Sequence, residues 1–577
     1  MPFLPRLAST VCVALLAGCA HQPSPTAAGP SELAVAESLY ADLRDVRDRI
    51  DVTLASGLKG ISDATPVTAG ITAHNALRRV VAARLDGIDS AGLQDEDRRA
   101  LAQMRRTLQS SLDSLKSPHA DSSTGLLRPP SCNYDPRAVA ASPRGVDSLR
   151  ARIYACYGWA QSHVLVDVGD TLDRLTILGA LGRTDPPDVR RRLFLSLDPV
   201  WRSMNGANEA SSPYRVLIAG RMAGGKGPPS LEQASASGVP PDSLEPWLEA
   251  MLDTWRRLSP DSLLEPWDWY YMVGAASRAL SPRISHSRLI QLNAAVYRAL
   301  GADVGQLRVR YELEPREGKT PVAYTTFGAR PRLMNGQWRA GQPWVFATYR
   351  TGGLDNLSEL LHETGHAIHI AAIRTRPGFA DWPDSDPFTE AVADFVALEV
   401  TEPAWQWRWL GDSVPLREGL RARYAGIVMD VAWALFELRM QRDPSLDPNQ
   451  VWTTLTRDYL RIRPHPELSW WAMRGQLVDA PGYMMNYAAG AMLIAAIRAR
   501  TRELHGPFAA GDSTWYAWVA PRLFRFGLER PSRQVIEDFL GGPVTPKAIL
   551  DDMARESGVG SEAPHPERSE GSSPNPA

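Results

Sequence analysis

The sequence predicts a mainly α-helical globular protein, and three observations support this prediction. Apolar residues recur at helical spacing between about Leu33 and Leu115, and similar patterns resume after residue 246. With 577 residues, of which 44% are hydrophobic and 22% charged, the chain can bury a large core. The 63 basic and 65 acidic residues leave a net charge of -2, so we expect no nucleic-acid partner.

The first 18 residues have the pattern of a signal peptide. Arg6 is followed by the apolar run LASTVCVALLAGC, which is too short to span a bilayer as a mature helix. The run ends in LAGC, which resembles a bacterial lipobox in which Cys19 is lipidated. A plain secretory signal is the alternative. We therefore expect an exported bacterial lipoprotein, anchored through Cys19 to a membrane and facing the periplasm or the cell exterior.

The rest of the chain is expected to divide into four segments. Residues 19–32 are rich in Pro, Ser and Ala and lack apolar periodicity, which predicts a flexible tether. Residues 33–245 are expected to form a helical N-terminal region that ends in a Pro-, Gly- and Ser-rich stretch. Residues 246–556 are expected to form a second region, and the polar, Pro- and Ser-rich residues 557–577 a disordered tail.

Two of the four cysteines remain for the folded part of an exported chain, Cys132 and Cys156. An oxidising compartment favours a disulfide between them. The two positions are 24 residues apart, and closing a loop of that length contributes about 3 kcal/mol. Two separate buried thiols are the alternative.

The segment PWVFATYR, from Pro343 to Arg350, has the aromatic and β-branched content of a strand. If it were an edge strand, it could pair with an extended peptide. An ordinary strand in a small sheet is compatible with that interpretation.

The stretch LLHETGHAIH directly follows this strand and has the pattern of a metal-binding helix. Positions i and i+4 of a helix face the same way, so His362 and His366 can present their imidazoles to one ion while Glu363 lies beside them. With only 11 histidines in the chain, this spacing around a glutamate would arise by chance in roughly one such sequence in a hundred. The spacing therefore indicates a zinc site.

A catalytic zinc takes three protein ligands and keeps one position for water. A turn-rich loop follows the first helix, and Asp386 and Pro387 are expected to be the N-cap and first position of a second helix. Glu390 lies in its first turn, and Asp394 follows one turn later on the same face, where it could accept a hydrogen bond from a ligating histidine. A solvated acidic face is the alternative, but apolar residues surround both carboxylates. We expect one Zn²⁺ ion per chain, bound by His362, His366 and Glu390.

The motif HETGHAIH, including its extra His369, resembles the signature of the thimet oligopeptidase and oligoendopeptidase F family of zinc metallopeptidases. The spacing from His366 to Glu390 and the run EAVADFVALEVTEP also resemble angiotensin-converting enzyme. This resemblance implies a large two-lobed helical fold with a deep central cleft and a small β-sheet beside the zinc helix. It also implies that Glu363 is the general base and Asp394 the carboxylate behind the zinc ligands.

A later stretch, DAPGYMMNYAAGAML, resembles the oligoendopeptidase F segment P-F-Y-x-Y-x-Y-A-x-G. The resemblance implies that Tyr483 and Tyr487 line the cleft and donate hydrogen bonds to the tetrahedral intermediate. Asp479 is a possible N-cap of their helix. For each tyrosine, the alternative is a packing role.

This stretch departs from the family pattern at two positions. Met485 replaces the middle tyrosine, and the family's upstream histidine falls at Gln476 or Leu477. His465 is a possible substitute donor, although prolines on both sides favour an ordinary loop histidine.

The sequence therefore predicts a monomeric, membrane-anchored zinc metallopeptidase that hydrolyses oligopeptides by means of a water activated by Glu363. Two other classes of function stay open. One is a non-catalytic peptide-binding or chaperone-like lipoprotein on a peptidase scaffold. The other is an exopeptidase of the peptidyl-dipeptidase type, because the sequence does not show what closes the ends of the cleft.

Overall fold

The computed structural model describes residues 31–56, 65–110, 129–142, 144–167, 170–225, 227–260, 262–315, 319, 322–508 and 510–555. The predicted signal peptide, Cys19, the tether as far as residue 30 and the tail lie outside the described residues. Within the described residues, no helix is both long enough and apolar enough to cross a lipid bilayer.

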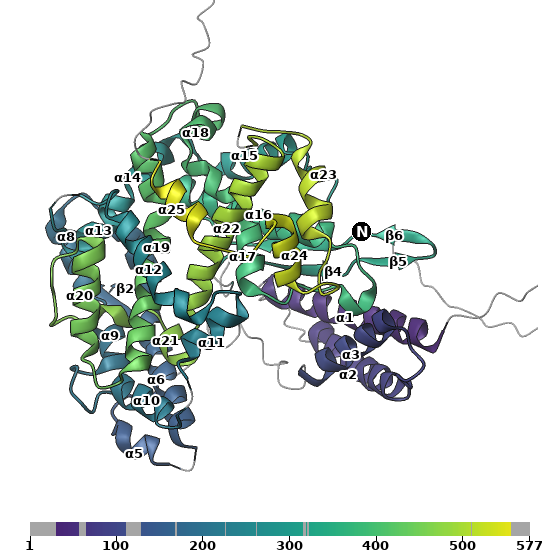
Figure 1. Cartoon of the computed structure of the whole chain (residues 1–577), viewed down its shortest axis with the longest axis horizontal. Helices are drawn as coiled ribbons and strands as arrows, with labels where there is room; N and C mark the ends of the chain where they lie inside the picture. Colours follow the sequence, from purple (N-terminus) through teal and green to yellow (C-terminus); the bar gives the residue numbers. More distant parts are fainter. Residues whose placement is uncertain are drawn as a thin grey trace, which may run out of the picture.

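The described residues up to Ser110 form three helices, α1 (Glu32–Ala55), α2 (Thr65–Asp86) and α3 (Asp95–Ser110). The hydroxyl of Ser31 caps α1 by accepting a hydrogen bond from the Ala34 amide at 3.2 Å. The buried apolar residues of the three helices, which include Tyr40 and Leu101, form a cluster of their own. Figure 1 shows these helices in purple beside the larger body.

The larger body is also mainly helical. Its first half contains α5 (Pro136–Ala140), α6 (Gly145–Ser162), α7 (Arg174–Leu181), α8 (Pro187–Leu195), α9 (Asp198–Asn205), α10 (Pro213–Met222), α11 (Pro229–Ala236), α12 (Pro241–Trp255), α13 (Pro266–Val273), α14 (Ala275–Leu280) and α15 (His286–Ala299). Its second half contains α16 (Leu354–Ala372), α17 (Asp386–Ala397), α18 (Pro403–Leu410), α19 (Leu416–Arg442), α20 (Pro448–Leu460), α21 (Gln476–Asp479), α22 (Met484–Leu504), α23 (Trp515–Val519), α24 (Ser532–Leu540) and α25 (Lys547–Met553). The prediction of a mainly helical fold is confirmed.

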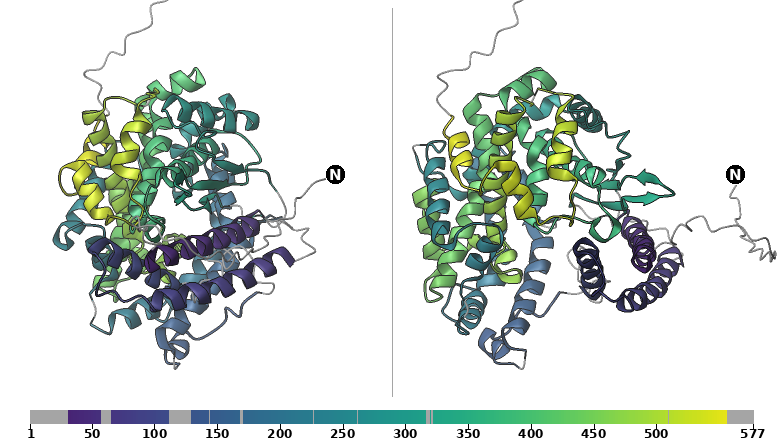
Figure 2. Two further views of the ribbon diagram at one scale, coloured as in Figure 1. Left: turned by 90° about the vertical axis from the view of Figure 1, so that its right-hand side faces the viewer. Right: turned by 45° about the vertical axis from the view of Figure 1, so that its right-hand side comes forward.

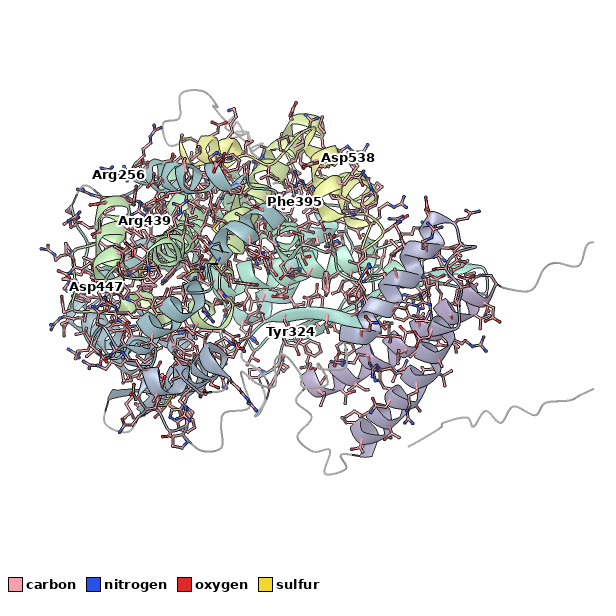
Figure 3. The ribbon with its side chains drawn as sticks, turned by 60° about the horizontal axis from the view of Figure 1, so that its bottom comes forward. Arg256, Tyr324, Phe395, Arg439, Asp447 and Asp538 are labelled. Atoms are coloured by element: carbon pink, nitrogen blue, oxygen red, sulfur yellow. A yellow bond between two sulfur atoms is a disulfide. The ribbon has the colours of Figure 1, made fainter. Side chains whose placement is uncertain are left out.

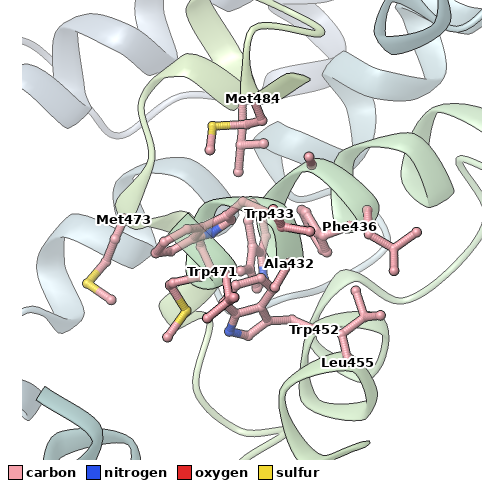
Figure 4. Packing of buried hydrophobic residues seen from close by; sticks show 14 of the residues in the cluster. Ala432, Trp433, Phe436, Trp452, Leu455, Trp471, Met473 and Met484 are labelled. Atoms are coloured by element: carbon pink, nitrogen blue, oxygen red, sulfur yellow. The ribbon is translucent and has the colours of Figure 1, made fainter. Parts of the chain in front are cut away.

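Two apolar cores hold this body together. The first surrounds α19, and Figure 4 shows its buried aromatic side chains, among them Trp433, Trp452 and Trp471. The rings of Trp433 and Trp452 stack with their centroids 5.0 Å apart. This core takes residues from both sides of position 246, and the predicted boundary there stays a prediction. The second core lies around α16 and α17.

The strands are few and short. A three-stranded sheet has the order β3-β7-β4, formed by β3 (Arg310–Glu312), β7 (Gln342–Phe346) and β4 (Tyr324–Ala329). Two separate hairpins are formed by β1 (Val164–Asp167) with β2 (Asp170–Leu172), and by β5 (Arg332–Met334) with β6 (Gln337–Arg339). The three-stranded sheet packs against α16, as expected for a small sheet beside the zinc helix.

The sheet corrects one expectation. The strand in PWVFATYR, considered as an edge strand, is the central strand β7, paired in parallel with β3 and antiparallel with β4. The edge strand beside α1 is β4, which Figure 3 shows at the label Tyr324, between the N-terminal helices and the larger body. Strand composition indicates the strand but not its neighbours, which come from segments far apart in the sequence.

Ion pairs connect the N-terminal helices to the larger body. Arg330, directly after β4, contacts Asp48 of α1 at 2.9 Å and Asp381 of the loop between α16 and α17 at 2.6 Å. In the same loop, Arg376 contacts Glu37 of α1 at 2.8 Å and Asp97 of α3 at 2.7 Å. Figure 2 shows these helices from two further sides.

A disulfide joins Cys132 and Cys156, whose Cα atoms lie 5.8 Å apart. It ties the segment before α5 to α6. The hydroxyl of Tyr157, the next residue on α6, donates to the Met473 carbonyl at 2.6 Å. The disulfide is therefore linked through α6 to the segment that leads toward α22.

Candidate metal centre

The helix α16 carries His362 and Glu363 on one turn and His366 on the next. It begins after Gly353, whose φ of 112° lies in a region that side-chain-bearing residues rarely adopt. The apolar residues on its other faces, such as Leu360 and Leu361, are fully buried in the second core. Packing therefore fixes the rotation of the helix and the direction of its polar residues.

The helix α17 carries Glu390 and Asp394. It begins one residue earlier than expected, because Ser385 is the N-cap and accepts a hydrogen bond from the Phe388 amide at 3.4 Å. Asp386 and Pro387 are the first two helical positions rather than the cap and the first position. Serine and aspartate are both common N-caps and stand side by side here, so the sequence alone could not separate them.

A glycine allows these two helices to cross closely. A Cβ atom at Gly365 would lie 2.4 Å from the carbonyl oxygen of Ala393, a contact that no real Cβ atom makes. Gly365 directly precedes His366, and Ala393 directly precedes Asp394. The missing side chain thus lets the main chains approach at the level where the metal-binding side chains face each other.

The nitrogen and oxygen atoms of His362, His366 and Glu390 come together within 4.8 Å of one another. The Oε2 atom of Glu390 lies 3.3 Å from Nε2 of His362 and 3.8 Å from Nε2 of His366. Two ligand atoms that are each about 2.1 Å from a tetrahedral zinc lie about 3.4 Å apart. Two imidazoles and a carboxylate at these distances fit a zinc ion, and the structure brings together the three ligands expected from the sequence.

Asp394 orients the first of these ligands. The Nδ1 atom of His362 donates to Oδ1 of Asp394 at 2.7 Å, which leaves Nε2 to face Glu390. Burial by itself would lower the pKa of His362, but the negative charges of Asp394, Glu390 and Glu363 outweigh it and raise that pKa well above its ordinary value. These three carboxylates therefore favour a positive charge at this position.

Glu363 is 6% exposed and points toward β4. Its Oε2 atom accepts a hydrogen bond from the hydroxyl of Thr325 at 2.7 Å. Sequence reasoning missed Thr325 because it belongs to no motif and lies 38 positions before Glu363. Only the pairing of β4 with β7, and of both with α16, brings the two residues together.

The third histidine of the motif, His369, lies away from the ligand group. Its ring packs among the rings of Trp382, Phe388 and Phe524, with centroid distances of 5.9, 6.2 and 5.4 Å. Burial lowers the pKa of His369 to about 3, which keeps the ring neutral. Neither of its nitrogens has a hydrogen-bond partner among the described residues.

Tyr483 and Tyr487 line a cavity of about 360 Å³ together with Glu390 and Asp394. Their rings lie edge to face, with centroids 5.6 Å apart. Burial raises the pKa of Tyr483 to about 12. Its hydroxyl therefore keeps its proton at neutral pH and can donate a hydrogen bond. The Nε2 atom of Gln476 donates to the Tyr487 oxygen at 3.3 Å, which leaves the Tyr487 hydroxyl proton for another acceptor.

The structure places three further residues discussed with these tyrosines: Asp479 differs from the expectation, whereas His465 lies in a loop, as its flanking prolines favour. Asp479 ends α21 and pairs with Arg150 at 2.6 Å, and α22 begins only at Met484, so Asp479 does not cap it. Met485 is fully buried in the first core. The ring nitrogens of His465 contact Glu265 and Glu467 at 2.8 and 2.7 Å, and His465 is not among the described residues that line the cavity.

No protein-family model and no curated protein sequence matches the chain. Solved structures do match. A protein designated CHT is 14% identical and covers 91% of this chain and 99% of its own, with a TM-score of 0.53. An M32 carboxypeptidase from Deinococcus radiodurans R1 is 13% identical and covers 90% of this chain and 97% of its own, with a TM-score of 0.52. A candidate oligoendopeptidase F is 14% identical and covers 89% of this chain and 96% of its own, with a TM-score of 0.48. The first two likenesses establish that the chain shares their largely helical fold.

Proposed function

We propose that the chain is a zinc metallopeptidase that hydrolyses peptide bonds in oligopeptides. The observation that carries the proposal is the meeting of His362, His366 and Glu390 from two helices, with the carboxylate of Glu363 beside them. Two imidazoles, one carboxylate and a neighbouring glutamate are the groups that metal-assisted hydrolysis requires. The fold shared with an M32 carboxypeptidase, which is named as a peptidase, supports the same class of reaction.

Each group has a distinct role in this proposal. A bound zinc ion would lower the pKa of a water molecule and polarise the peptide carbonyl. Glu363 would act as general base by taking up a proton from the attacking water, and would return it to the leaving amine. Asp394 keeps His362 in the tautomer that offers Nε2 to the metal.

The two tyrosines complete the site. Both line the cavity that contains Glu390. A phenol hydroxyl there would donate to the carbonyl oxygen as negative charge develops on it. Tyr487 is the preferred donor to the carbonyl oxygen. The Gln476 amide donates to the Tyr487 oxygen, so the hydroxyl proton of Tyr487 is left for the substrate.

Localisation and partners belong to the same proposal. We propose an exported lipoprotein that acts as a monomer on oligopeptides outside the cytoplasm, with Cys19 as the lipid attachment site. Lipidation is tested by mass spectrometry of the mature N-terminus. An unmodified N-terminus, or one generated elsewhere in the chain, would refute this part.

An exopeptidase is a second candidate, favoured by the likeness to a carboxypeptidase. The deciding experiment is mass spectrometry of the products from a mixed peptide library, combined with elemental analysis of the purified chain. We expect about one zinc ion per chain and cleavage that stops on addition of a chelator. Cleavage sites within peptides indicate an endopeptidase, whereas release of terminal residues or dipeptides indicates an exopeptidase.

The control is Glu363→Gln, which preserves the shape of the side chain but removes the base. This variant should retain zinc and lose turnover. A wild-type chain that binds peptides without cleaving any, with zinc bound, would instead support the non-catalytic peptide-binding function. A zinc-reconstituted sample that holds no metal would refute the proposed site itself.

A further inference from the structure

We infer that Thr325 of β4 is a positioning residue for Glu363. This inference rests on the proposed function, in which Glu363 is the general base. The Thr325 hydroxyl lies 2.7 Å from Oε2 of Glu363 and 2.8 Å from the main-chain oxygen of the same residue. A hydroxyl has one proton to donate and both of these oxygens are acceptors, so the Thr325 proton is shared between the side chain and the backbone of the candidate base.

The position of Thr325 is fixed by the sheet. Thr325 stands opposite Val345 of the central strand β7, and Val345 is fully buried. Successive strand residues point to opposite faces, so Thr325 and Phe327 share the face toward α16, whereas Thr326 points away. Phe327 confirms this direction, because its ring meets that of Trp382, which in turn contacts the ring of His366.

The contact limits the orientation of the Glu363 carboxylate. A glutamate carboxylate rotates broadly about its last side-chain bond, so burial alone does not determine which oxygen faces the metal-binding atoms. With Oε2 bound to Thr325, the other oxygen remains for the reacting water. A base held in this way needs no reorientation before it accepts a proton, which is the advantage of a preorganised site.

The test compares three single substitutions in the full zinc-loaded chain. Thr325→Val exchanges the hydroxyl for a methyl group of nearly the same size, and Thr325→Ser retains the hydroxyl. Thr326→Val is the matched control, with the same exchange at the next position on the opposite face of β4. We expect Thr325→Val to lower kcat about 10- to 100-fold with little change in KM or zinc content. Thr325→Ser should restore most of the loss, and Thr326→Val should behave as wild type.

A second experiment determines the orientation of the Glu363 carboxylate directly. In a crystal structure of zinc-loaded Thr325→Val, the Glu363 carboxylate should leave the position that it has in the wild type. Thr325→Val should also have no further effect on the residual rate of Glu363→Gln, because no base remains to be positioned. If Thr325→Val does not fold, Thr325→Ala provides the same loss of the hydroxyl without added bulk.

Several results would overturn the inference. They are an unchanged kcat in Thr325→Val, an effect on KM or zinc content alone, an equal loss in Thr326→Val, or a failure of Thr325→Ser to recover activity. A wild-type chain that holds zinc but hydrolyses no peptide would refute the proposed function first, and the inference with it. If the wild-type chain hydrolyses peptides and Thr325→Val has the same kcat, only the inference about Thr325 is refuted.

Discussion

Replacing Gly365 with alanine should push apart the two helices that carry the candidate metal ligands. The added Cβ would lie 2.4 Å from the carbonyl oxygen of Ala393 and 2.8 Å from its Cα, and both are backbone atoms of α17 that cannot rotate away. Non-bonded heavy atoms rest about 3.5 Å apart, so α17 must move by roughly 1 Å. Overpacking of this kind lowers the free energy of unfolding by about 1–3 kcal/mol. The same displacement changes the distances from Glu390 to both histidines.

Zinc affinity, measured by competition with a chelator, is the primary assay for Gly365→Ala. We expect a loss of about tenfold or more in affinity, and a loss of up to about a hundredfold in kcat/KM. The control is Gly158→Ala on α6, where nothing lies within 4 Å of the added Cβ. This control should be neutral or slightly stabilising, because alanine favours a helix over glycine by about 1 kcal/mol. Wild-type zinc affinity in Gly365→Ala would refute the argument that this crossing sets the ligand geometry.

Two further predictions concern the candidate site, and a third concerns Glu437, a buried residue of α19. Asp394→Asn should weaken zinc binding about 10- to 100-fold, since His362 loses its charged acceptor, and chelator competition measures this. Tyr487→Phe should lower kcat on the order of a hundredfold at unchanged zinc content, whereas a normal kcat would show a packing role. Burial raises the pKa of Glu437 from 4.5 to about 8. The folded chain thus holds this proton more tightly than the unfolded chain, and stability should fall as pH rises through that range. Melting curves of Glu437→Gln should lack this contribution, and identical pH profiles for both proteins would contradict it.

The candidate ligand set is predictable from the sequence because its geometry is mostly local. The spacing of His362 and His366 places both on one face of any helix, and Glu390 and Asp394 are related in the same way on the next helix. Helical periodicity and cap residues are enough to recognise such elements. Only the crossing of the two helices is non-local: the residues predict that Glu390 joins the two histidines, but not how closely the helices approach.

The parts that could not be predicted depend on contacts between distant segments. Thr325 lies on a strand of six residues whose neighbours are set by the sheet order, and no pattern in TTFGA indicates a contact with Glu363. Gly365 is visible within HETGH, but its close approach to Ala393 requires both helices. The start of α22 was placed too early because Asp479 is a good N-cap type, whereas in the structure Arg150 pairs with its carboxylate.

The way in which α1–α3 are held beside β4 has a consequence for how firmly these helices stay attached. Their apolar residues form a separate core, and Arg330 and Arg376 bridge them to the larger body through carboxylates. If the two parts separated, these charges would regain their hydration, which offsets much of the lost Coulomb attraction. The junction of the three helices with the larger body therefore depends on the geometry of these charge pairs rather than on a shared apolar core. Salt screens exposed ion pairs but affects buried ones weakly, and the side chains of Arg330 and Asp48 are only 8% and 3% exposed, so this junction should resist high ionic strength better than a surface ion pair would.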